Sequence, residues 1–288
     1  MAGMDARPTG TIERLGPGLA RILAPNPSPF TYTGTQTYVL GTRQLAVIDP
    51  GPDEPAHVAA LVEAVRGAEV RAILVTHNHR DHSPAARPLQ AATGAPILGC
   101  APLALVDDGV PTDEAFDLDH RPDRVLADGE AVAAEDWTLE TVATPGHTSN
   151  HLCFAWRETG ALFSGDHVMG WSTSVVAPPD GDMAAYMASL DTLLARPEQI
   201  YYPTHGPAIR DGHDHVRRLI AHRRARERQV LAALEAGEGR IPAIVADLYR
   251  DVDPRLHPAA ARSVLAHLID LARRGAVREE AGRWTRAG

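Results

Sequence analysis

The sequence predicts an α/β domain followed by a small, mostly helical domain. Up to about residue 208, short apolar runs of β-forming residues alternate with amphipathic stretches. From residue 209 onward, helical patterns follow one another and the balance of charge reverses. Residues 1–208 hold 12 arginines against 26 acidic residues, whereas residues 209–288 hold 16 against 11. We therefore expect a first domain over residues 1–208 and a second over residues 209–288.

Apolar runs of three to five residues predict the strands of the first domain. These runs cover residues 38–40, 45–48, 72–75, 139–142, 152–156, 161–163 and 200–202. Amphipathic spacing predicts helices over residues 55–65, 82–93 and 183–195. Several predicted strands end directly in a cluster of polar residues. Loops at strand ends, supported by a rigid sheet, commonly carry functional residues.

The second domain is expected to be winged-helix-like. Its first helix covers residues 213–234 and is broken at Gly237. Pro242 and Pro258 each stand at the first turn of a further helix, and Gly275 ends the last one. Two short strand-like pieces then flank residues 281–282. Three helices followed by a hairpin predict this type of domain.

Composition limits the class of protein. The chain has 288 residues with 44% hydrophobic content, which is enough to bury a full core. No window approaches the roughly 18 consecutive apolar residues of a spanning helix, and the first residues lack the apolar stretch of a signal peptide. We therefore expect a cytoplasmic protein without membrane contact. Cys100 and Cys153 show no metal-binding spacing, so buried reduced thiols are expected rather than a disulfide.

The segment from Thr76 to His82 is the strongest functional signal in the chain. It places three histidines and one aspartate in a short loop after a predicted strand. Imidazole nitrogens and carboxylate oxygens are the ligands that Zn²⁺ and related ions accept. In an extended turn, His77 and His79 can point one way while Asp81 and His82 point the other, so one loop can serve two ions.

Further candidate ligands recur at other strand ends. His147, Asp166 and His205 stand in Pro-Gly-His, Ser-Gly-Asp and Pro-Thr-His sequences. His151 and His167 lie close to them in the sequence, and we expect these two to support ligands or to pack. Asp49 is either the acceptor that orients a ligand histidine or a plain turn residue. Phe30, Tyr32 and Trp171 line the substrate pocket or simply pack.

The complete motif resembles that of the metallo-β-lactamase superfamily. The pattern His-x-His-x-Asp-His, followed by one His, one Asp and one His, carries the resemblance, which covers residues from about 20 to 208. The resemblance implies an αββα sandwich with a metal site along one edge. It also implies two Zn²⁺ ions, with Mn²⁺ or Fe²⁺ as alternatives. The first ion would be held by His77, His79 and His147, and the second by Asp81, His82 and His205, with Asp166 bridging both.

One branch of this superfamily is more closely similar. The segments Asn26 to Phe30, Gly34 to Tyr38, His79 to Ser83 and Tyr186 to Leu190 resemble the branch of β-lactamase-like protein 2. The resemblance implies a winged-helix-like C-terminal domain, which agrees with the helical pattern found there. It also implies endonuclease activity on single-stranded RNA.

The predicted reaction is hydrolysis by a metal-bridging hydroxide. Two divalent ions, two carboxylates and a hydroxide leave the centre near +1, so it should attract anionic substrates. Asp81 is the expected catalytic residue, because it can hold the hydroxide in line and carry a proton to the leaving group. Ser164 lacks the flanking glycines of a serine-hydrolase elbow, so the chain offers no rival nucleophile.

Several functions fit these residues. Phosphodiester cleavage in single-stranded RNA is the main prediction, and thioester or ester hydrolysis of the hydroxyacylglutathione type is the alternative. A non-catalytic nucleic-acid-binding or scaffold protein stays open. A lactamase or an iron dioxygenase is less favoured, because no export signal is visible and the ligand set is complete.

The most basic helix bears on that choice. Arg223, Arg224, Arg226 and Arg228 either contact phosphates or form a solvated face on which Arg223 pairs with Glu227. The expected partner is accordingly an anionic small molecule or single-stranded RNA. A net charge of −9 argues against strong affinity for nucleic acid.

Overall fold

The structure is a computed structural model that describes residues 8–103 and 115–287. The chain forms two compact units that are interleaved along the sequence. The first consists of Met1–Thr144, Asn150–Ser172 and Pro197–Gly212, and the second of Pro145–Ser149, Thr173–Arg196 and His213–Gly288. The domain division expected at residue 208 stays a prediction.

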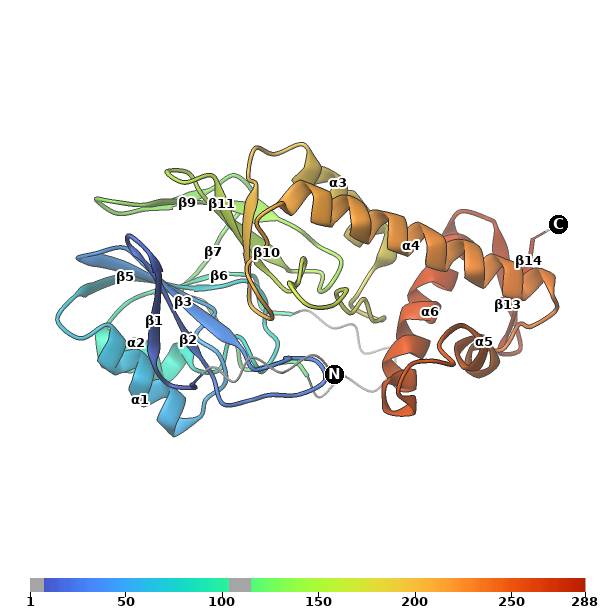
Figure 1. Cartoon of the computed structure of the whole chain (residues 1–288), viewed down its shortest axis with the longest axis horizontal. Helices are drawn as coiled ribbons and strands as arrows, with labels where there is room; N and C mark the ends of the chain where they lie inside the picture. Colours follow the sequence, from blue (N-terminus) through green and yellow to red (C-terminus); the bar gives the residue numbers. More distant parts are fainter. Residues whose placement is uncertain (1–7, 104–114, 288) are drawn as a thin grey trace. The chain divides into compact units, whose positions relative to one another are not determined.

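A seven-stranded mixed sheet forms one half of the first unit (Figure 1). Its strands, in spatial order, are β1 (Ile12–Gly16), β2 (Leu19–Leu23), β3 (Gln36–Leu40), β4 (Gln44–Ile48), β5 (Glu69–Val75), β6 (Ile97–Gly99) and β7 (Arg124–Val125). The strands from β1 to β4 pair antiparallel, and those from β4 to β7 pair parallel. Helix α1 (Pro55–Ala64) connects β4 to β5, and helix α2 (Ala86–Thr93) connects β5 to β6. The ends of β4 and β5 therefore meet at the same edge of the sheet.

A five-stranded mixed sheet forms the other half. Its strands, in spatial order, are β12 (Ile200–Pro203), β11 (Ala161–Gly165), β10 (Leu152–Trp156), β9 (Thr138–Ala143) and β8 (Ala131–Ala133). Every residue of β10 and β11 is buried, which is typical of strands covered on both faces. Residues of both sheets share one apolar core, in which the rings of Tyr38 and Phe163 lie 5.2 Å apart. The first unit is thus a two-sheet sandwich.

The second unit is mostly helical. Its elements are α3 (Met183–Leu194), α4 (Gly212–Glu235), α5 (Ile241–Leu248), a 3-10 turn (Pro254–Leu256), α6 (His257–Arg273), β13 (Val277–Glu280) and β14 (Arg283–Arg286). Apolar side chains of α4, α5, α6 and β13 form its core, among them Val230, Ile244, Leu268 and Val277. The hairpin turns at residues 281 and 282, which both have positive φ, as a two-residue turn between twisted strands requires.

The α/β class and the sandwich predicted from the sequence are confirmed, and each predicted strand is present. Strands β1, β2, β6, β7 and β8 were not predicted, because most are too short for alternation to show. The helix expected from His82 begins at Ala86 instead. The N–H groups of His82 and Ser83 bond to the carbonyl of His79, and that of Ala85 bonds to Gly51, so this stretch is committed to a loop. No helix among the described residues is long and apolar enough to cross a membrane.

Candidate metal centre

Asp49, directly after β4, holds together three segments of the first unit. Its backbone has a positive φ of 48°, and its side chain is buried. Oδ1 accepts from the Thr76 N–H at 2.8 Å, and Oδ2 accepts from the hydroxyls of Thr76 and Thr204, each at 2.8 Å. Oδ2 also lies 3.0 Å from Nδ1 of His82. The expectation that Asp49 orients a histidine is confirmed.

This carboxylate fixes which nitrogen two histidines present to the site. The Nδ1–H of His82 donates to Asp49, so Nε2 is the nitrogen that faces the site. Thr76 donates its hydroxyl proton to Asp49 and lies 3.0 Å from Nδ1 of His77, so it accepts the Nδ1–H of that ring. Nε2 of His77 is then unprotonated, and it lies 2.9 Å from Nδ1 of His79.

The loop from His77 to His82 is braced on its outer side by residues 115–117. Arg80 donates its N–H to Ala115 at 2.7 Å and its Nε to Phe116 at 3.0 Å. Ser83 donates to the Asp117 carboxylate at 2.7 Å. Because both the backbone and the side chains of the loop are engaged, the histidines are held in place before any ligand binds.

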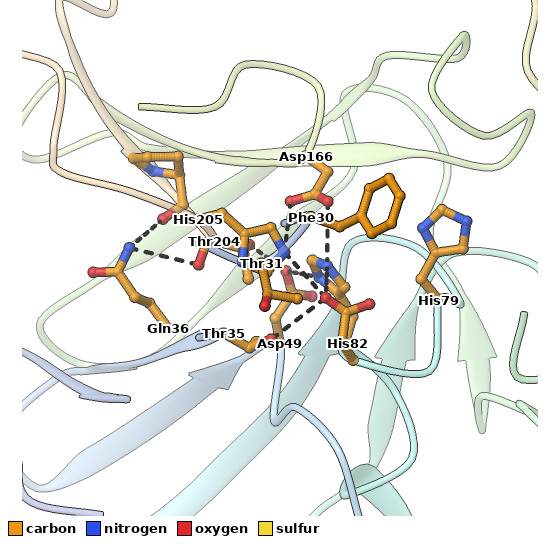
Figure 2. A network of polar contacts seen from close by, with 12 residues as sticks. Phe30, Thr31, Thr35, Gln36, Asp49, His79, His82, Asp166, Thr204 and His205 are labelled. Carbon is orange, nitrogen blue, oxygen red and sulfur yellow. Dashed lines mark hydrogen bonds and ion pairs between the residues drawn. The ribbon is translucent and has the colours of Figure 1, made fainter. Parts of the chain in front are cut away.

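Two carboxylates and two imidazoles converge inside the first unit (Figure 2). Nε2 of His205 lies 3.0 Å from Asp81 and 3.4 Å from Asp166, and Nε2 of His82 lies 3.5 Å from each. His77, His82 and Asp166 offer ligand atoms within 4.8 Å of one another, and so do Asp81, His82 and His205. Ligand atoms that share one ion at about 2.0–2.2 Å stand roughly 3.3–3.5 Å apart. The spacing therefore fits divalent ions.

The Nε2 atom of His82 supports the same interpretation. This Nε2 is buried, and its two nearest acceptors, the carboxylates of Asp81 and Asp166, both lie at 3.5 Å, too far for a well-formed hydrogen bond. A buried polar atom without a partner costs about 1–3 kcal/mol. A cation at this place would satisfy it.

The charges of the four groups are strongly coupled. Burial acts to raise the pKa of Asp81, but the charges of His82 and His205 and their hydrogen bonds hold it well below its usual range. The pKa of Asp166 is held low for the same reasons. Burial acts to lower the pKa of His205, but Asp166 and Asp81 raise it to about 10. In the absence of ions, protons on the imidazoles balance the carboxylates, and a bound cation would replace those protons.

His151 and Gly165 place Asp166. The backbone N–H of Asp166 donates to Nε2 of His151 at 3.2 Å, and Nδ1 of that ring lies 2.8 Å from the Thr144 hydroxyl. Gly165 has a φ of 51°, and a Cβ there would lie 2.6 Å from Nε2 of His151. His151 therefore supports a candidate ligand, as the sequence predicts.

His205 is held by residues to which the sequence analysis assigned no role. Its Nδ1 lies 3.3 Å from the Gly34 carbonyl, so Nε2 faces the carboxylates. Gln36 donates to the carbonyls of Pro203 and Gly206 at 3.2 and 2.6 Å, and Tyr38 donates to Pro203 at 2.7 Å. The polar pair Gln36-Thr37 directly before a predicted strand was the available signal.

His147 belongs to the second unit. Its Nδ1 lies 2.6 Å from the Val175 carbonyl, which accepts the Nδ1–H and leaves Nε2 as the potential ligand atom. Gly146 has a φ of 138°, and a Cβ there would lie 2.3 Å from Cα of Tyr186. A larger residue at position 146 is therefore excluded.

The three aromatic residues considered for the substrate pocket and the two cysteines have different surroundings. Tyr32 and Trp171 stack with their rings 5.0 Å apart, while Phe30 is 53% exposed. Both cysteines are buried and free, and burial raises the pKa of the Cys100 thiol far above its usual value. The expectation of reduced thiols agrees with this.

The basic helix differs from both interpretations of the sequence. Arg223 is buried, so it is neither a phosphate contact nor part of a solvated face. The predicted pair with Glu227 is also wrong, because Glu227 pairs with Arg274. Arg226 lies over the ring of Tyr249 at 4.4 Å. Arg224 and Arg228 are exposed.

Comparison with known proteins identifies the families that this chain matches. Residues 31–205 match the model of the metallo-beta-lactamase superfamily, and residues 241–284 match that of the beta-lactamase associated winged helix domain, which confirms the predicted type of C-terminal domain. An atrochrysone carboxyl ACP thioesterase from Aspergillus chevalieri is 34% identical over 83% of this chain and 75% of its own length. A beta-lactamase-like protein 2 homolog from Caenorhabditis elegans is 35% identical over 79% and 74%, respectively. The crystal structure of a beta-lactamase domain protein from Burkholderia ambifaria aligns with a TM-score of 0.77 over 98% of this chain and 96% of its own, at 23% identity.

Proposed function

Because the chain belongs to the metallo-β-lactamase superfamily, we propose that it is a dinuclear metal-dependent hydrolase that cleaves thioesters. The observation that carries the proposal is the convergence of Asp81, His82, Asp166 and His205 within 3.0–3.5 Å in a largely buried site. Such a set suits a hard or borderline divalent cation and has no evident structural purpose without one.

Seven residues are proposed to hold the ions. His77, His79 and His147 take the first ion, Asp81, His82 and His205 take the second, and Asp166 bridges them. The hydrogen bonds at Nδ1 of His82, His147 and His205 support this assignment, because each leaves Nε2 for an ion. Zn²⁺ is the proposed metal, with Mn²⁺ or Fe²⁺ as alternatives that suit the same ligands.

The chemistry divides between the ions and the protein. When bound, divalent ions supply Lewis acidity that polarises the scissile carbonyl and lowers the pKa of water. Asp81 is proposed as the catalytic carboxylate, since its side chain is 26% exposed and its pKa is held low. It can orient water as a hydrogen-bond acceptor and pass a proton to the leaving group. Asp49 holds His82 in position during the reaction, and His151 holds Asp166.

A thioester is proposed rather than RNA for two reasons. A relative named as a thioesterase shares 34% identity over most of this chain. In addition, two of the four arginines that could contact phosphates are engaged by other residues of the chain, since Arg223 is buried and Arg226 lies over the ring of Tyr249. A thiolate is also a good leaving group, since a free thiol has a pKa near 8.5, so its departure needs little help from an acid.

A substrate panel tests this proposal. The purified full chain is treated with a chelator, reconstituted with Zn²⁺ or Mn²⁺, and assayed on acyl-carrier and hydroxyacylglutathione thioesters, an oxygen ester, a lactam and single-stranded RNA. We expect the thioesters to be hydrolysed fastest, with activity lost in the chelated protein and in Asp166→Ala. Cleavage of RNA without thioester hydrolysis would overturn the proposal.

Cleavage of single-stranded RNA is the second candidate, favoured by the two exposed arginines Arg224 and Arg228. Changing both to glutamine removes at most two phosphate contacts. If RNA is the substrate, the slope of log affinity against log salt should become shallower by about 0.7 for each contact. Thioester hydrolysis should be unchanged in this variant.

A further inference from the structure

Arg223 of α4 is a buried cation that the proposed reaction does not yet use. Its side chain is almost fully enclosed, with the residue 4% exposed. Taking a guanidinium out of water costs several kcal/mol unless it is well paired. Among the described residues no carboxylate forms an ion pair with it, so its partners must be neutral groups. Such an arrangement calls for a reason beyond stability.

The partners of Arg223 are a carbonyl, a hydroxyl and an aromatic ring. Nη2 donates to the carbonyl of Ser174, and Nη1 donates to the Ser263 hydroxyl at 3.2 Å. The guanidinium also lies over the ring of Tyr186, 5.2 Å from its centre. Arg223 thereby ties α4 to α6, to α3 and to the segment that contains Ser174.

That segment also orients His147. The carbonyl of Val175, the residue after Ser174, accepts the Nδ1–H of His147 at 2.6 Å. The carbonyls of Ser174 and Val175 belong to adjacent peptide planes that share the Cα of Val175, so once the first plane is fixed, the second can move only through φ and ψ of Val175. Ser174 and Val176 are both buried, which leaves this short segment little freedom to adjust.

Tyr186 provides a second connection to the same histidine. A Cβ on Gly146 would lie 2.3 Å from the Cα of Tyr186. The backbone just before His147 therefore packs directly against α3. Arg223 packs on the ring of this same Tyr186. The guanidinium therefore acts on His147 through its hydrogen-bond acceptor and through its backbone support.

We infer that Arg223 is a positioning residue for His147, which fixes the ring so that Nε2 is presented to an ion. The inference rests on the proposed role of His147 as a ligand. It assigns to the long C-terminal helix a part in metal binding, although α4 itself supplies no ligand.

Paired variants of the full chain test the inference. Arg223→Gln is compared with Arg224→Gln, the same change at the exposed neighbouring position on the same helix. Apo protein is titrated with Zn²⁺, and with Co²⁺ to follow the absorption spectrum of each site. We expect Arg223→Gln to weaken binding of one of the two ions by up to about 10–100-fold, the effect expected when His147 loses its hydrogen bond to Val175. Arg224→Gln should bind both ions as the unaltered protein does.

Two further variants separate positioning from packing. Arg223→Lys retains one donor and the charge, and should recover part of the lost affinity. His147→Gln should weaken binding of the same ion. Adding Arg223→Gln to this variant should not weaken binding of that ion any further. Equal losses at both ions, or additive losses in the double variant, would overturn the inference. Because metal binding is measured without substrate, failure of thioester hydrolysis would count against the proposed function alone.

Discussion

At the scale of single residues, the site depends on side chains that cannot themselves reach an ion. Asp49 accepts four hydrogen bonds, from the backbone and hydroxyl of Thr76, from Thr204 and from His82. An ionised carboxylate is well suited to this, because it has two oxygens that only accept. An amide of the same shape would turn two N–H donors toward groups that also donate.

Asp49→Asn should therefore disturb the ligands without removing any. We expect affinity for the ion bound by His82 to fall by about 10–100-fold, because that ring loses the acceptor that fixes its tautomer. Metal titration of the apo protein measures this. Asp53→Asn is the matched control, since Asp53 is exposed and only four residues away. Unchanged metal binding in Asp49→Asn would show that Thr76 and Thr204 alone suffice to place the loop.

His267 of α6 provides a second prediction at this scale. The residue is 2% exposed, and burial together with the positive charge of Arg223 lowers its pKa to about 3. The unfolded chain takes up this proton below about pH 6.5, whereas the folded chain takes it up only near pH 3. Stability contributed by the neutral ring is thus complete above pH 6.5 and is lost as the pH falls.

We expect the free energy of unfolding of the second unit to drop by about 2 kcal/mol between pH 7 and pH 5 through His267 alone. His267→Leu should remove that part of the pH dependence. Hydrogen exchange of the α6 amides at pH 5, 6 and 7 measures this pH dependence in both proteins. The difference in free energy between the two proteins at pH 7 is the baseline with which the differences at pH 5 and 6 are compared. An identical slope in both proteins would show that His267 is protonated in the folded state.

At the scale of elements, the site follows from where strands end. The polar clusters after β4, β5, β11 and β12 were predicted from the sequence, and the structure brings ligand candidates from three of them together. Ligand types and strand ends are local features, so they can be read from one segment. The bracing by Gln36, Tyr38 and residues 115–117 could not, because it joins segments far apart in the chain.

Helix α4 shows how a local signal can be misjudged. Arg223 stands in a run of basic residues, which suggested a solvated face. Its spacing from Val216, Ile220 and Val230, all buried, places it instead on the apolar stripe of the helix. Helical periodicity was therefore the better guide to its burial than charge. The three-residue β6 and two-residue β7, by contrast, offered no pattern to detect.

The end of β11 gives a prediction at this scale. Gly165→Ala places a Cβ 2.6 Å from His151 and 2.9 Å from the Thr76 hydroxyl, next to Asp166. Gly160→Ala is the matched control, since it also has positive φ, at 64°, but its Cβ would meet nothing within 4 Å. We expect about 1 kcal/mol of backbone strain in both variants and a further 1–3 kcal/mol from overpacking at Gly165 alone.

Denaturant unfolding measures these losses, and elemental analysis measures metal content. Only Gly165→Ala should lose metal, because the displaced His151 no longer holds the Asp166 backbone. Equal destabilisation of the two variants, with full metal content in both, would show that β11 can shift without cost to the site.

At the scale of the whole molecule, charge is concentrated where the ions would bind. The chain carries a net charge of −9, yet Asp166, which is buried, and Asp81, which is partly buried, must stay ionised beside each other. In the apo protein only protonated imidazoles oppose them. Divalent ions provide stronger compensation, so the folded state and the metal-bound state should be linked thermodynamically.

The last prediction follows from this linkage. Elemental analysis after reconstitution with excess Zn²⁺ or Mn²⁺ should find two ions per chain. Each ion present at 100 times its dissociation constant stabilises the folded state by about 2.7 kcal/mol, so chelation should lower the melting temperature of the full chain by several degrees. The exposed-site variant Asp53→Asn should respond as the unaltered protein does. His205→Asn should retain one ion and show about half of the shift, because the ligands proposed for the other ion are unchanged. At most one ion per chain in the unaltered protein would exclude a dinuclear centre, and a melting temperature indifferent to chelation would mean that the apo site is held together by its own protons.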